Sequence, residues 1–174
     1  MKVETVTAYL ASKKNIRGKK ALQKLIYFCK ESGIPLDCSY RMHLYGPYSH
    51  EVAQELHDVI EMELLKEDNL NMGFTQGTAC ETYLKQHERE IETYRNKLDA
   101  VLEKFGSFSP LLLELYATTH FIATARYQTY GAVTKQEVIM EVRQAKGNKF
   151  TIQQIEKAYL QMQEWGMLPP DGVA

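Results

Sequence analysis

The histidines are the first residues of this sequence that could support chemistry. His50 and His57 lie seven positions apart, and on a helix this spacing puts both on one face. Gln54 lies between them, but a neutral amide is a poor metal ligand and a metal site needs convergent ligands. We therefore interpret both as surface histidines. An enzyme would need a pocket that joins His43, His50 or His57 to a carboxylate.

Other catalytic patterns are missing from the chain. No G-x-x-x-x-G-K-[ST], G-x-G-x-x-G, H-E-x-x-H or G-x-S-x-G motif occurs, so no nucleotide cradle, zincin site or nucleophile elbow is indicated. Cys29, Cys38 and Cys80 are odd in number and widely spaced, which is typical of reduced thiols in a cytosolic protein. His120 lies in a very apolar segment and is expected to be a core histidine. We predict no enzyme, no catalytic residue, no cofactor and no metal.

A short basic cluster is the candidate for nucleic-acid binding. Lysine and arginine side chains can meet phosphates, which provide most of the non-specific affinity for nucleic acid. A solvated surface is the simpler interpretation for so short a cluster. Its members are Lys13, Lys14, Arg17, Lys19, Lys20 and Lys24.

An acidic segment follows Ser49, which has the character of a helix N-cap. This helix is expected to run to about Leu65, with Glu51, Glu55 and Asp58 among its charges and no Lys or Arg before Lys66. If the chain is a winged helix, this is the element that would read the DNA groove. Base readout usually uses Arg, Lys, Asn or Gln, so the charge opposes DNA binding.

Tyrosines surround the Gly46-Pro47 turn. Tyrosine is favoured at protein interfaces because it buries a large area and keeps a polar tip, although these side chains could equally fix a strand-to-helix corner. Our candidates for protein binding combine this corner with the acidic helix: Tyr45, Tyr48, Glu51, Glu55 and Asp58.

The elements that position these residues are mostly helical. In the first half we expect helices over 3–12, 19–32 and 49–65, a short strand over 40–45, and a β-hairpin with arms at Phe74-Thr75 and Thr82-Tyr83-Leu84. This order is that of a winged helix.

The second half is predicted to be all helix. Its helices are expected at 86–104, from Ser109-Pro110 to Tyr127, 134–146 and 151–165, with capping boxes at Thr134-x-x-Glu137 and Thr151-x-x-Gln154. The predicted fold class is mainly α (α+β): a winged-helix-like lobe over 1–84, and a helical lobe over 85–174 packed on it or continuous with it.

Composition is that of an ordinary globular protein. The chain has 174 residues, a formal net charge of −1, 44% hydrophobic and 25% charged residues. Wholly disordered, collagen-like and low-complexity classes are thereby excluded. The apolar run at Leu111 is interrupted by Glu114, and Met1-Lys2-Val3-Glu4 has no apolar core of a secretory signal, so we expect neither a membrane span nor export.

Two segments resemble a known signature. Lys20-Ala21-Leu22-Gln23-Lys24-Leu25-Ile26-Tyr27-Phe28 and Leu44-Tyr45-Gly46-Pro47-Tyr48-Ser49 are similar to the K-L-Q-K-L-x-Y and Y-G-P-Y-S motifs of YwgA-like bacterial proteins, with Ala21 a minor departure. A more distant similarity links them to the Panacea domain of SocA-type antitoxins. The match covers residues 18–66.

The resemblance implies a winged-helix-like fold and binding without catalysis, since Panacea domains neutralise toxins or serve as adaptors. It supplies no catalytic residues. The sequence therefore predicts a cytoplasmic, non-enzymatic regulator that binds a partner protein. The alternative is a winged-helix DNA-binding transcriptional regulator. Neither the partner's identity nor the oligomeric state follows from the sequence.

Overall fold

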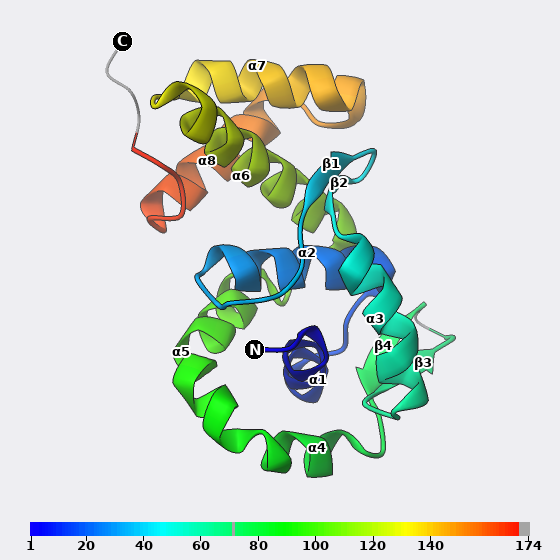
Figure 1. The fold of residues 1–174 in the computed structure, drawn as a ribbon. Coiled ribbons are helices and arrows are strands. Elements are labelled where there is room, and N and C mark those ends of the chain that lie inside the picture. The colour runs from blue at the N-terminus through cyan, green and yellow to red at the C-terminus, as the bar shows by residue number, and fades with distance from the viewer. Residues whose placement is uncertain (71, 171–174) are drawn as a thin grey trace. The chain divides into compact units, whose positions relative to one another are not determined.

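The structure is a computed structural model that describes residues 1–70 and 72–170 (Figure 1). It is mainly helical with a small β part, as the sequence predicted, and this β part consists of two small antiparallel hairpins. The chain divides into two compact units. Unit 1 comprises residues 1–41 and 48–113, and unit 2 comprises residues 42–47 together with those from 114 onward.

Unit 1 is built around α1 (Val3–Lys13), which lies in the middle of its other helices (Figure 1). Val6, Ala8 and Leu10 of α1 have no exposed surface. α2 (Gly18–Glu31) and α3 (His50–Glu61) each pack on α1. The predicted i, i+3, i+4 stripe of α2 is buried, from Leu22 through Cys29.

A second hairpin follows α3 and completes the winged-helix order. β3 (Leu65–Asp68) pairs antiparallel with β4 (Gly73–Gln76). Ile16, between α1 and α2, adds a further bridge to β4, with both N–H···O distances to Phe74 at 2.8 Å. Gly73 permits this approach, because a Cβ there would lie 2.4 Å from the Ile16 carbonyl oxygen.

The predicted position of this hairpin was wrong in one arm. Phe74-Thr75 is in β4, but Thr82-Tyr83-Leu84 lies in α4 (Cys80–Gln86). The other arm is β3, of which only Leu65 falls within the helix expected over 49–65. The Tyr83 hydroxyl lies 3.2 Å from that of Thr5 in α1. Packing against α1 thus overrides the strand preference of these side chains.

α5 (Glu88–Phe105) closes unit 1. It packs on α1 and α2, and the Phe105 ring stacks on that of Phe28 with centroids 3.8 Å apart. This packing is why residues 85–113 group with the N-terminal helices, which differs from the expected division at residue 84.

Unit 2 contains most of α6 (Pro110–Tyr130), then α7 (Lys135–Lys146), the 3-10 turn η1 (Gly147–Lys149) and α8 (Ile152–Glu164). Both predicted capping boxes are confirmed, with the Thr134 and Thr151 hydroxyls accepting from the N–H groups of Glu137 and Gln154. No helix among the described residues is both long and apolar enough to cross a membrane.

The predicted strand over 40–45 is a pair of short strands, β1 (Arg41–His43) and β2 (Gly46–Tyr48). Gly46 has a φ of 86°, a left-handed conformation that favours glycine at this turn. We call residues 42–47 the hairpin tip. Although flanked in sequence by unit 1, the hairpin tip belongs to unit 2.

Candidate functional site

Three acidic residues of α3 share one face of the helix; Asp58 is exposed, and Glu51 and Glu55 are half-buried. Glu51, Glu55 and Asp58 follow i, i+4, i+7 spacing and therefore share a face; we call them the acidic stripe. Glu4 of α1 adds to this charge, because burial and the charges of Glu4 and Asp58 raise the pKa of Glu55. Lys2 acts in the opposite direction and lowers the same pKa, so the acidic charge is offset only in part.

Glu51 differs from the other two. It accepts hydrogen bonds from the hydroxyls of Ser49 and Ser39, each at 2.8 Å. Its own backbone N–H and these two hydroxyls lower its pKa to about 2. The Glu51 carboxylate is thus held by Ser39 of the preceding loop and by Ser49 at the start of α3, whereas Asp58 is exposed.

The two signature segments meet in unit 1 through Gln23 and Ser49. The Gln23 amide donates to the Ser49 carbonyl at 2.8 Å and accepts from the Ser49 N–H at 3.0 Å. Both residues are buried, and Ser49 also caps α3 by accepting from the Val52 N–H at 3.2 Å. This pairing fixes the start of α3, so these signature positions have an architectural role.

The basic cluster is exposed only in part. Lys24 is only 2% exposed, so the expectation that it meets phosphates was wrong: it lies on the buried side of α2. Lys13 lies over the Tyr9 ring at 5.5 Å, and Lys20 is half-buried. Lys14, Arg17 and Lys19 are exposed.

Two of these cations lie beside the β3–β4 hairpin. Ile16 and Gly18 flank Arg17, and Gly18 is so close to β4 that a Cβ there would lie 3.0 Å from the Met72 carbonyl oxygen. Arg17 and Lys19 therefore border the β3–β4 hairpin. This is the arrangement that favours the DNA alternative.

The two tyrosine candidates are assigned to different units. Tyr45 is 49% exposed and belongs to unit 2, whereas Tyr48 is half-buried in unit 1 and meets the His50 ring edge-on. Leu44, beside Tyr45, is 71% exposed. The expected single corner of Tyr45, Tyr48 and the acidic stripe is thus divided between the two units.

A buried ionic cluster in unit 2 was missed. Glu114 of α6 is fully buried, and its carboxylate lies 3.0 Å from Lys146 Nζ and 2.6 Å from Lys149 Nζ. Lys146 also donates to the Leu44 carbonyl at 2.7 Å, and Lys149 Nζ lies 5.1 Å above the Tyr45 ring. The one available signal was a lone carboxylate inside the apolar run at Leu111, because buried charges need partners.

The histidines occupy different environments. His57 lies 3.1 Å from Glu61 on the same face of α3, and both side chains are mostly exposed. His120 is 3% exposed, confirming a core histidine, and its Nε2 lies 3.1 Å from the Met167 carbonyl oxygen. Over residues 1–70 and 72–170, no group of three or more His, Cys, Asp or Glu side chains is arranged to hold a metal ion.

The thiols are buried as well. Cys29, Cys38 and Cys80 are free and buried, and burial raises the pKa of Cys29 far above that of an exposed thiol. Such a thiol is mostly protonated and therefore a poor nucleophile. The interpretation of Cys29 as a packing residue agrees with this environment.

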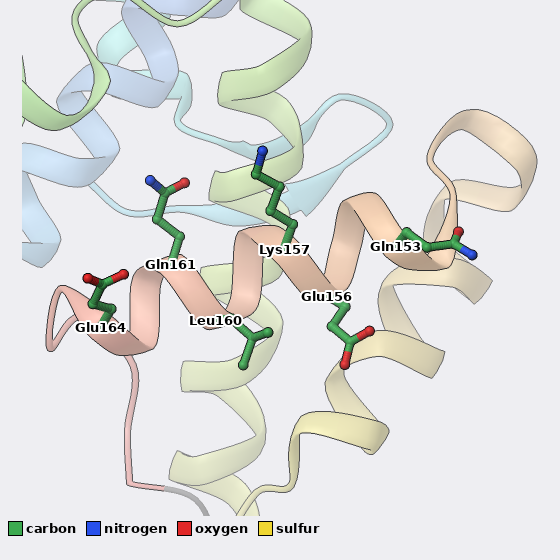
Figure 2. A pocket seen from close by; sticks show the side chains of 6 residues that line it. All are labelled: Gln153, Glu156, Lys157, Leu160, Gln161 and Glu164. Atoms are coloured by element: carbon green, nitrogen blue, oxygen red, sulfur yellow. The ribbon is translucent and has the colours of Figure 1, made fainter.

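A shallow hollow runs along α8. Figure 2 shows that Lys157 and Gln161 extend to one side of the helix, whereas Glu156 and Leu160 extend to the other. Glu156 is already paired with Lys135 at 2.7 Å. These side chains diverge, so the hollow does not gather reactive groups around one point.

Comparison with known proteins gives one relative and no family. No protein-family model matches the chain. It is 27% identical over 109 residues to a Bacillus subtilis protein described as uncharacterized protein YwgA, a match that covers 59% of this chain. The chain spans 63% of the length of that relative. This similarity supports the YwgA-like resemblance, whereas a relation to the Panacea domain stays a prediction.

Proposed function

We propose that this protein is a non-enzymatic, cytoplasmic regulatory module that binds a partner protein through the acidic stripe of α3. The observation that carries the proposal is the gathering of Glu4, Glu55 and Asp58 at the helix that stands third in the winged-helix order. A nucleic-acid reader at this place would need the opposite charge. An antitoxin-like or adaptor-like role agrees with this chemistry.

The partner surface is expected to be basic. An excess of carboxylates raises the association rate of a cationic partner and disfavours acidic partners, and this effect weakens as salt increases. Because burial and neighbouring acids already raise the Glu55 pKa, a partner cation would relieve repulsion as well as add attraction. The acidic stripe therefore favours a partner that presents Lys or Arg.

The test is capture from a cytosolic extract with the full chain and two charge-reversal variants. Glu55→Lys with Asp58→Lys inverts the acidic stripe, and Glu88→Lys with Glu103→Lys inverts two exposed acids of α5 as a matched control. We expect a specific protein that the wild type and the control retain and the α3 variant loses. Equal recovery by all three proteins, or no specific protein at all, would reject the proposal.

The DNA-binding alternative is favoured by one observation, the position of Arg17 and Lys19 beside the β3–β4 hairpin. In this alternative both cations contact phosphates, so affinity falls as salt rises. The test is fluorescence anisotropy with a labelled random-sequence duplex at low and high salt. Binding that weakens in an Arg17→Glu, Lys19→Glu variant would support this alternative, and an unchanged signal would remove it.

A further inference from the structure

The base of the β1–β2 hairpin is closed by side chains of α2 and α3. Glu51 of α3 accepts hydrogen bonds at 2.8 Å from Ser39, which precedes β1, and from Ser49, which follows β2. Gln23 of α2 makes a second bridge, because its side chain pairs with the Ser49 backbone and its carbonyl accepts from the Tyr40 hydroxyl at 3.2 Å. These two bridges tie the chain that enters the hairpin to the chain that leaves it.

The other end of the hairpin is held within unit 2. Lys146 Nζ donates to the Leu44 carbonyl at 2.7 Å, and Lys149 Nζ lies 5.1 Å from the centroid of the Tyr45 ring. The buried carboxylate of Glu114 binds both lysines, at 3.0 Å and 2.6 Å. The hairpin tip is therefore attached to cations that a buried anion positions.

The hairpin between these two attachments is weak by itself. β1 and β2 have three residues each, and all three residues of β1 are exposed. An isolated two-stranded hairpin is marginally stable at best in water, and one this short buries little apolar surface. The pairing of its strands therefore depends on the attachments at both ends.

We propose that residues 39–49 form a strap that couples the start of α3 to unit 2. In this device Glu51 is a positioning residue: when its hydrogen bonds are lost, the base of the hairpin opens, the strands fray, and the hairpin tip loosens from Lys146. The coupling is reciprocal, so loosening the hairpin tip also loosens the start of α3. It goes beyond the proposed binding role of α3 and holds whatever that helix binds.

The experiment is hydrogen exchange, read by mass spectrometry, on the full chain without a partner. Glu51→Ala removes the carboxylate at the base, and Ser39→Ala removes one exposed hydroxyl as a milder change. The matched control is Glu55→Ala, which removes an acid one turn further along the same face of α3. Lys149→Met loosens the opposite end, with the exchange of residues 50–53 as its readout.

We expect exchange of residues 42–47 to accelerate about tenfold in Glu51→Ala and about threefold in Ser39→Ala, because hydrogen bonds to a charged group are lost, and to stay unchanged in Glu55→Ala. Lys149→Met should accelerate exchange of residues 50–53. The proposal is overturned if neither base variant changes the hairpin tip, if Glu55→Ala has the same effect, or if Lys149→Met leaves the start of α3 unaltered.

Ser39→Ala decides the case in which Glu51→Ala unfolds the chain as a whole. Acceleration in Ser39→Ala that extends uniformly through α8 would also overturn the strap, because the effect would then be global. Every variant is measured without a partner, so the outcome of the capture experiment and the outcome of this one are independent.

Discussion

Carboxylates in the two units of this protein have contrasting environments. On α3 of unit 1, Glu55 lies near the like charges of Glu4 and Asp58, which Lys2 offsets only in part. In unit 2, Glu114 is fully buried and is bound by Lys146 and Lys149. A charge that is buried and paired fixes the architecture, whereas acidic charge that is at least partly exposed and only partly offset is available to a partner.

The strongest way to break this comparison is to remove Glu114. In a Glu114→Ala variant the buried Lys146 loses its carboxylate, and breaking a buried ion pair costs about 3–5 kcal/mol. Urea denaturation should show this loss in the free energy of unfolding. Glu156→Gln, which breaks the half-exposed pair with Lys135, should cost at most about 1 kcal/mol. Equal effects of the two variants would contradict the distinction.

The buried side chain of His120 should make the stability of unit 2 depend on pH. Burial lowers the pKa of His120 from 6.5 to about 4. Between pH 6.5 and about 4, His120 is therefore protonated in the unfolded chain and neutral in the folded chain. Stability contributed by neutral His120 is therefore present above pH 6.5 and is lost as pH falls toward 4, by roughly 3 kcal/mol at about 1.4 kcal/mol per pKa unit.

Thermal unfolding over this pH range measures the effect. A His120→Gln variant keeps a side-chain donor for the Met167 carbonyl but cannot take up a proton, so its stability should depend less on pH in this window. The same pH dependence in both proteins would assign the effect to other groups.

The neutral pairing of Gln23 with Ser49 should have an intermediate effect. In Gln23→Ala, the Ser49 N–H and carbonyl lose a buried partner, and an unsatisfied buried polar group costs about 1–3 kcal/mol. Hydrogen exchange should show faster opening at the N-terminus of α3, whereas α8 of unit 2 should keep its protection. Uniform acceleration across the chain would show that the pairing has no local role.

The smallest effect is expected on the acidic stripe itself. Glu55→Gln removes a charge that Glu4 and Asp58 repel, so the free energy of unfolding should stay within about 0.5 kcal/mol of wild type or rise slightly. Chemical denaturation measures this directly. A clear loss of stability would mean that Glu55, like Glu114, is an architectural residue.

The sequence predicted what local chemistry determines. The capping boxes at Thr134 and Thr151 and the cap of α3 at Ser49 were found because each depends on residues two or three positions apart. The α2 stripe followed from periodicity. Strand β3 was missed because Lys66-Glu67-Asp68 has little strand preference, and its pairing with β4 is set by the hairpin and the Ile16 bridge.

The candidate sites were predicted less well, for a physical reason. Lys24 looked like a surface cation, but its position on α2 buries it. Glu114 and Lys146 are 32 positions apart, and nothing in either local sequence indicates that they meet. The grouping of Tyr45 with the acidic stripe stays a prediction; the structure assigns Tyr45 to unit 2 and the acidic stripe to unit 1.

The central claim is that acidic side chains on α3 oppose nucleic acid at the place where a winged helix would read it. The most direct measurement is the affinity of a random-sequence duplex at low salt for the wild type and for the Glu55→Lys, Asp58→Lys variant. We predict negligible binding by the wild type and at least about tenfold tighter binding by the variant. Tight, salt-sensitive binding by the wild type that the variant does not improve would contradict it.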